Sequence, residues 1–232
     1  SSYEFAGSDP SVTGTVQRSL QGKLDEYVSV LDFGADNTGS ADCVDAFETA
    51  FTQLFRNTDN TFKKVLIVPN GTYTFSGDLN IPSNAIIHGE TRDGVVLNIG
   101  TNSIHLITSV GSTSGFSSTD RPENIAVSNI TIRRTSGQVD ITGASQTKFA
   151  AVKFIGSYEL GDTVTDIVTE PAAVYWINDT ESTKVTDVVF DNCLFESNSI
   201  SIKATQSEAF DTDVKILNSK FFINHLGVYI EG

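Results

Sequence analysis

The chain has 232 residues, enough to bury one hydrophobic core, and a single elongated domain behind a short leader is the simplest organisation. Its 29 acidic and 15 basic residues are spread along the chain and give a net charge of −14, which argues against nucleic acid and anionic membranes as partners. Two cysteines are too few for a disulfide framework, and no apolar run approaches the roughly 18 residues that a membrane-spanning helix needs.

Residues 1–27 are expected to form a linker and then a neck helix. Residues 1–12 are polar and contain turn formers, which is typical of a linker. From residue 13 onward, four apolar side chains recur at helical spacing as one narrow stripe: Val16, Leu20, Leu24 and Tyr27. Such a stripe either packs against sister helices on a threefold axis or lies on its own domain, and both interpretations stay open.

Residues 28–55 are predicted to hold a strand followed by the most convincing helix of the chain. Val28–Leu31 alternates at strand period, residues 36–39 have turn chemistry, and the apolar spacing then changes to 3.6 residues. We expect a helix over about 41–55 with Ser40 as its N-cap. Its apolar face would comprise Cys43, Phe47, Ala50, Phe51 and Leu54.

Short strands bounded by Pro, Gly, Asn or Asp follow, and an internal repeat distinguishes among the possible β architectures. The apolar and Asn pattern of residues 125–132 recurs at 188–195 and again, 26 residues later, at 214–221. A period in the mid-twenties fits one coil of a parallel β-helix, with Asn192 and Asn218 as stacked bend residues that point inward. The helix would cover the first coil, and residues 28–232 are expected to be the N-terminal part of a longer β-helix domain.

Three motifs carry a family resemblance: Asp32-Phe33-Gly34-Ala35 behind a valine strand, Val68-Pro69-Asn70-Gly71-Thr72-Tyr73, and Ile86-Ile87-His88-Gly89-Glu90. They resemble the opening of the pectate-lyase-like domains of bacteriophage tailspikes. The resemblance implies an all-β fold, a right-handed single-stranded parallel β-helix with an N-terminal capping helix and a short neck. It also implies a homotrimer on the virion that is attached to the phage tail or baseplate through the N-terminus, assembled in the host cytoplasm and active outside the cell.

Candidate site residues come from the outward positions of the repeat. Asp187 and Asp213 occupy the same slot in two copies, so on neighbouring coils their backbones would lie about 4.8 Å apart, which suits either a catalytic carboxyl pair or two hydrated surface charges. Trp176 and Tyr229 are candidate sugar platforms. Alternation places Tyr229 outside, whereas it leaves the face of Trp176 undecided between a platform and the core.

The resemblance implies a tailspike that recognises a host surface polysaccharide, either capsule or lipopolysaccharide, and leaves open whether it also depolymerises that polymer as a glycoside hydrolase or lyase. A non-catalytic tail fibre adhesin and a secreted pectin-active lyase or hydrolase are the alternatives. No His and Cys cluster has metal-ligand spacing, and the sequence has no phosphate loop or dinucleotide fingerprint. We therefore expect neither a metal nor a cofactor.

Overall fold

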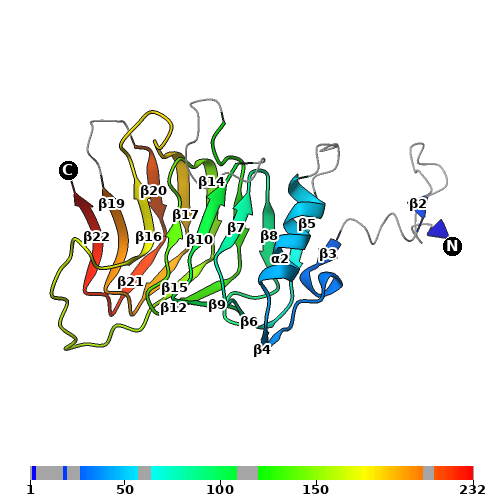
Figure 1. Cartoon of the computed structure of the whole chain (residues 1–232), viewed down its shortest axis with the longest axis horizontal. Helices are drawn as coiled ribbons and strands as arrows, with labels where there is room; N and C mark the ends of the chain where they lie inside the picture. Colours follow the sequence, from blue (N-terminus) through cyan, green and yellow to red (C-terminus); the bar gives the residue numbers. More distant parts are fainter. Residues whose placement is uncertain are drawn as a thin grey trace.

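The chain winds into a stack of coils in which each full coil contributes one strand to each of three parallel sheets (Figure 1). The structure is a computed structural model that describes residues 2–3, 18–19, 27–56, 64–108, 120–205 and 212–231. The arrangement is a right-handed parallel β-helix, which confirms the predicted fold class.

Each sheet takes every third strand along the stack. The first sheet contains β3 (Tyr27–Ser29), β5 (Val65–Val68), β8 (Ile86–Gly89), β11 (Ala126–Ser128), β14 (Ser145–Ala150), β17 (Thr186–Asp191) and β20 (Val214–Leu217). The second contains β4 (Thr38–Asp42), β6 (Gly71–Thr74), β9 (Val95–Gly100), β12 (Thr131–Arg134), β15 (Lys153–Ile155), β18 (Leu194–Glu196) and β21 (Lys220–Phe222). The third contains β7 (Leu79–Pro82), β10 (Ile104–Ile107), β13 (Val139–Asp140), β16 (Ala172–Ile177), β19 (Ile200–Thr205) and β22 (Leu226–Glu231).

The predicted repeat register is confirmed, because Val188 pairs with Val214 and Phe190 with Ile216 in neighbouring strands of the first sheet. The predicted direction of the bend asparagines is wrong. Asn192 and Asn218 are exposed and adopt left-handed backbone angles, with φ of 55° and 51°. At this corner the chain turns sharply from the first sheet to the second, and asparagine tolerates the left-handed conformation that the turn requires.

A buried asparagine lies one corner later, between the second and third sheets. Asn198 is 0% exposed, and its side-chain amide donates to the carbonyls of Phe154 at 3.1 Å and Glu196 at 3.0 Å. Its backbone N–H donates to Asn224 Oδ1 at 2.9 Å. These side chains therefore satisfy backbone groups that the bend takes out of the sheets.

The first coil begins differently from the prediction. Strand β3 ends at Ser29, and a 3-10 helix, η1 (Val30–Phe33), follows, with a capping box between Ser29 and Asp32 and a left-handed Gly34 at its end. The capping helix starts later than expected, as α2 (Val44–Phe51) continued by the π-helical η2 (Thr52–Arg56). Ser40 lies in β4 and is not the N-cap. The apolar face is confirmed, since all five of its predicted residues are buried.

Helix α2 occupies the position that a strand of the third sheet holds in later coils. It contacts the edge strand β7, where Glu48 Oε1 accepts the N–H of Asn80 at 2.8 Å and Arg56 donates to the Asn80 carbonyl at 3.3 Å. Arg56 and Glu48 are themselves paired at 3.0 Å. The helix thus covers the apolar end of the stack and also satisfies the open edge of a sheet.

Most of the expected neck lies outside the described residues. Within it, Arg18–Ser19 forms strand β2, which pairs antiparallel with β1 (Ser2–Tyr3) and so differs from the helix expected there. Of the described residues, no helix is long and apolar enough to cross a membrane.

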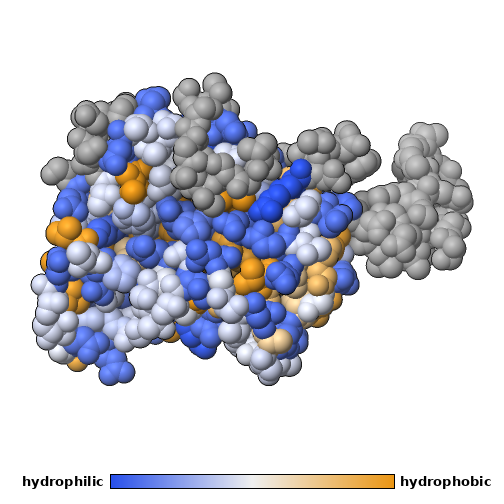
Figure 2. Space-filling model, in the orientation of Figure 1, coloured by the Kyte–Doolittle hydropathy of each residue, from blue (hydrophilic) through white to orange (hydrophobic). Residues whose placement is uncertain are grey.

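The interior is built from aligned columns of side chains, and the last coil leaves its own columns uncovered. Phe154, Phe195 and Phe221 stack in sequence with ring centroids 4.9 and 4.8 Å apart. Figure 2 shows apolar residues at the end of the stack that carries β22. The exposed large apolar side chains of this coil are Ile216, Leu217, Phe221, Phe222, Val228 and Ile230. Patches of this kind are usually covered by another protein surface.

Candidate functional site

The third sheet presents a continuous row of polar and aromatic side chains on its outer face. Side chains alternate along each strand, so the residue between two inward-facing apolar positions points out. The register of the sheet aligns one such residue from each of its six strands, about 4.8 Å from strand to strand. This outer row consists of Asn80, His105, Asp140, Tyr175, Lys203 and Tyr229.

His105 joins three coils through two carboxylates. Its Nε2 lies 3.5 Å from Asp78 Oδ2, and its Nδ1 lies 3.4 Å from Asp140 Oδ2. A carboxylate at each ring nitrogen favours the imidazolium form, which donates from both, and the hydrogen bond with Asp140 raises the pKa of His105. Burial opposes ionisation of Asp140, but hydrogen bonds from His105 and Thr142 outweigh it and hold the pKa of Asp140 below its usual value.

Lys203 is a buried cation in the outer row. Only 5% of the residue is exposed, and its Nζ donates to the backbone carbonyls of Val168, Ile167 (3.3 Å) and Glu170 (3.5 Å). The same Nζ lies 6.0 Å from the ring centroid of Tyr229. Lys203 therefore fastens the loop of residues 157–171, drawn yellow-green in Figure 1, against the third sheet.

Two further contacts hold the ends of this loop. Arg134 donates to the Pro171 carbonyl at 3.0 Å and to Asn198 Oδ1 at 3.2 Å. Burial of the guanidinium lowers the pKa of Arg134 to about 10. At the other end, the Tyr158 N–H donates to the Ser197 carbonyl at 2.8 Å, and the Tyr158 ring packs edge-on against His225. The loop forms a fixed wall beside the outer row.

Replacing Lys203 by Met should release this wall, because up to three carbonyls lose a charged donor while the aliphatic stem is kept. We expect backbone hydrogen exchange in residues 157–171 to become about tenfold faster or more, since hydrogen bonds to charged groups contribute about 1.5–3 kcal/mol. The matched control is Lys215→Met, which removes an exposed ammonium paired with Asp213 at 3.1 Å. Equal exchange in the two variants would show that Lys203 does not hold the loop.

The predicted pair Asp187 and Asp213 lies in one slot of neighbouring coils, as the repeat indicated, because the Val188 N–H donates to the Asp213 carbonyl at 3.0 Å. Both residues are exposed, and Asp213 is paired with Lys215. They belong to the first sheet and the corner before it, and not to the outer row. Within the described ranges, no group of three or more His, Cys, Asp and Glu side chains could hold a metal ion.

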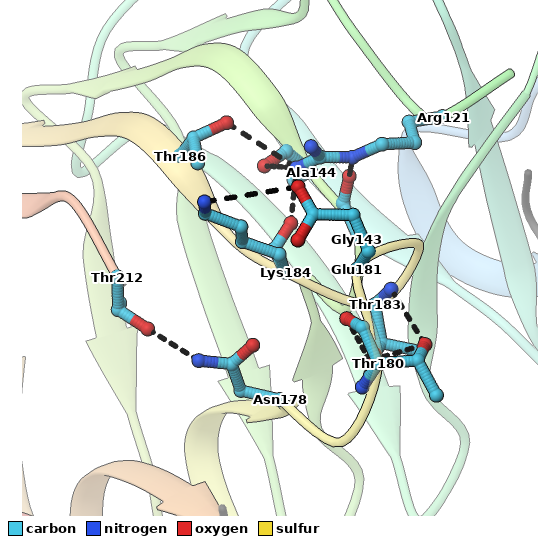
Figure 3. Close-up of polar contacts among 10 residues, drawn as sticks. All are labelled: Arg121, Gly143, Ala144, Asn178, Thr180, Glu181, Thr183, Lys184, Thr186 and Thr212. Carbon is cyan, nitrogen blue, oxygen red and sulfur yellow. Dashed lines mark hydrogen bonds and ion pairs between the residues drawn. The ribbon is translucent and has the colours of Figure 1, made fainter. Parts of the chain in front are cut away.

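Hydrogen bonds from Arg121 join neighbouring coils at the corner beside Asp187 (Figure 3). Its guanidinium donates to the carbonyls of Gly143 at 2.8 Å, Ala144 at 3.2 Å and Lys184, and it reaches Thr186 Oγ1 at 3.3 Å. Burial lowers the pKa of Arg121. The donors of Arg121 are therefore directed at the protein's own backbone, so the arginine acts here as a structural element.

Comparison with known proteins agrees with this architecture. The model of the family "Rhamnogalacturonase A/epimerase, pectate lyase-like" matches residues 27–229. The chain belongs to this pectate-lyase-like family. The match confirms the resemblance that the three sequence motifs indicated. No curated protein matches the chain in sequence.

Solved structures share the pectate-lyase-like fold at low identity. ORF18 of Geobacillus virus E2 is 14% identical with a TM-score of 0.54, over 87% of this chain and 50% of that one. Tailspike protein 3 of bacteriophage CBA120 is 16% identical with a TM-score of 0.49, over 95% of this chain and 41% of that one. The chain thus spans half the length of the first of these two structures and less than half of the second.

The two aromatic candidates differ in position within the pectate-lyase-like domain. Trp176 is 4% exposed and points into the core, so its prediction as a sugar platform is wrong. In the next strand of the third sheet, Trp176 is in register with Ala204, which also faces the core. Tyr229 lies on the outer face as predicted, but the ammonium of Lys203 lies over its ring. Tyr175, one strand away on the other side of Lys203, is half-buried on the outer face, and its hydroxyl lies 3.2 Å from Thr205 Oγ1.

Sequence reasoning missed the other members of the outer row. The sheet register brings His105, Asp140 and Tyr175 together at a spacing of 35 residues, which differs from the 26-residue spacing of the repeat recognised in the sequence. Only Lys203 and Tyr229 keep the 26-residue spacing of the repeat. Aligning every short apolar strand as a rung, whatever the loop length, is the signal that could have found the row.

Proposed function

We propose that this pectate-lyase-like chain is part of a phage tailspike that binds a host surface polysaccharide, capsule or lipopolysaccharide, on the outer face of the third sheet. The observation that carries the proposal is the outer row beside its fixed loop. Five of the six strands present amide, imidazole, carboxylate and phenol groups along one face, and the Lys203 ammonium of the remaining strand is bonded to loop carbonyls. Sugar hydroxyls donate and accept hydrogen bonds, and sugar C–H faces pack on aromatic rings, so such a row suits an extended glycan.

The tailspike-like motifs, together with the fold shared with a protein of Geobacillus virus E2, support the phage assignment. The proposal includes a location on the virion tail, a homotrimer, and attachment to the tail or baseplate through the N-terminal region. It also includes further β-helix beyond residues 28–232.

Tyr175→Ala tests the binding face, because Tyr175 is the outer-row aromatic that does not lie beneath the Lys203 ammonium. We expect the Kd for a recognised polysaccharide to rise about tenfold, as an aromatic contact of about 1.5 kcal/mol would give. The measurement is surface plasmon resonance against capsule and lipopolysaccharide preparations from a panel of bacteria. Tyr27→Ala, which removes an exposed tyrosine from the first sheet, is the control. A larger loss in the control than in Tyr175→Ala would contradict the assignment of the face.

Cleavage is a second candidate function, favoured by the shared slot of Asp187 and Asp213. If these carboxylates form the catalytic pair of a hydrolase, Asp187→Asn and Asp213→Asn should each reduce depolymerisation by about two orders of magnitude or more without unfolding the chain. The readout is the release of reducing ends from the bound polysaccharide. Full activity in both variants would place any chemistry elsewhere. The exposure of both residues and the Lys215 contact favour binding without cleavage.

A further inference from the structure

We propose that the glycan bound on the outer face of the third sheet is uncharged or carries amino groups, and is not a polyanion such as a uronate, sulfate or phosphate polymer. The inference rests on the proposed function and adds the chemical class of the ligand. It is carried by how charges are distributed among the three sheets and by the contacts that each cation of the third sheet already makes.

Basic residues are unevenly distributed among the described strands. The first sheet carries Lys148 and Lys215, and the second carries Arg133, Arg134, Lys153 and Lys220. The described strands of the third sheet carry one lysine, Lys203, and no arginine, together with His105 and the acidic residues Asp140 and Glu231.

Each cation at this face is already committed to a partner within the protein. The Lys203 ammonium faces loop carbonyls, and Arg56, at the edge strand, is paired with Glu48 at 3.0 Å. The imidazole of His105 has a carboxylate at both nitrogens. Recognition of a sugar carboxylate, sulfate or phosphate requires an available guanidinium or ammonium donor. Among the described residues, the outer row offers none.

The acidic side chains that pair with His105 remain partly exposed on the same face. The Asp78 side chain is 54% exposed and that of Asp140 is 26% exposed. The loop wall adds Glu159, Asp162, Asp166 and Glu170 and no basic residue. On a chain with a net charge of −14, this face repels a polyanion, whereas its carboxylates accept hydrogen bonds from neutral hydroxyls and pair with sugar ammonium groups.

The test uses matched polymers that differ only in charge, together with an array of bacterial surface glycans. Acidic members are presented beside carboxyl-reduced copies, and amino-bearing members beside N-acetylated copies, with EDTA and separately with Ca²⁺. We expect the protein to bind neutral or amino-bearing members and to favour the reduced copy of any acidic glycan at least tenfold. Tighter binding of the acidic copy, with or without Ca²⁺, would overturn the inference while leaving polysaccharide binding intact.

A folded protein that binds no member of the array would instead count against the proposed function, and the inference would fall with it. A protein variant gives a second readout. Asp78→Asn should weaken binding of amino-bearing glycans at least threefold. It should also reduce the ratio of the affinity for a carboxyl-reduced glycan to the affinity for its acidic copy. The control is Asp93→Asn, which removes the same charge from an exposed side chain at the corner between the first and second sheets. Equal effects of the two variants would show that only net charge matters, and would overturn the assignment to this face.

Discussion

Replacing Trp176 by Ala is expected to lower the free energy of unfolding by about 3–5 kcal/mol, the usual cost of truncating a buried aromatic side chain. The indole is 4% exposed and belongs to the continuous apolar core of the stack. Loss of the indole leaves a cavity between coils. The coils cannot move together to fill it, because backbone hydrogen bonds between neighbouring strands fix their positions. Urea unfolding followed by circular dichroism measures the change.

Tyr175→Ala is the neighbouring control, because the next residue of the same strand points outward. We expect it to cost about 1 kcal/mol or less in stability, since the ring is not part of the core. The two variants should therefore have different effects. Trp176→Ala should lower the free energy of unfolding, whereas Tyr175→Ala should weaken glycan binding. A Trp176→Ala protein of unchanged stability that no longer binds glycan would restore Trp176 as a sugar platform.

The second prediction is a loss of stability as the pH rises through the raised pKa of His105. A cation whose pKa is higher in the folded than in the unfolded chain stabilises the fold fully below its unfolded pKa, about 6.5 for histidine, and less as the folded group loses its proton. The lowered pKa of Asp140 acts in the opposite sense, so its contribution is lost as the pH falls through that value. The contacts among Asp78, His105 and Asp140 are therefore strongest between these two limits.

Melting temperatures measured from acid to alkaline pH check this prediction. His105→Gln should remove the alkaline part of the decline, because a neutral amide does not titrate. His88→Gln is the control, since His88 contacts the Ser128 hydroxyl at 2.9 Å on the first sheet and, among the described residues, is not paired with a carboxylate. Parallel pH profiles for the unmutated chain and His105→Gln would refute a stabilising role for the three-coil contact.

Much of the fold was predictable because its signals are periodic. The apolar face of α2 repeats at helical spacing, and Val188 and Val214 repeat at the length of one coil. The parts that could not be predicted depend on local or three-dimensional detail. Helix η1 forms where the capping box of Ser29 and Asp32 outweighs the alternating pattern around it. The inward asparagine was misassigned because Asn192 and Asn198 both lie at corners, and only the packed interior shows which of them is enclosed.

The candidate site was less predictable than the fold. Alternation gives the relative sides of Tyr175 and Trp176 but not which side faces the core, and that choice depends on the strands stacked on either side. Asp187 and Asp213 could be paired because a constant spacing connects them. His105 and Asp140 lie 35 residues apart, outside the 26-residue spacing of the recognised repeat, so that repeat did not indicate their contact.

The way the loop of residues 157–171 is fastened bears on how such proteins can diversify. Lys203 and Arg134 hold it through main-chain oxygens, which every amino acid supplies. The contacts that Lys203 and Arg134 make with the loop therefore do not depend on the identity of the loop side chains. Substitutions in the loop can change the side chains that a ligand meets while these main-chain hydrogen bonds are kept. Ligand specificity can therefore evolve separately from folding at this position.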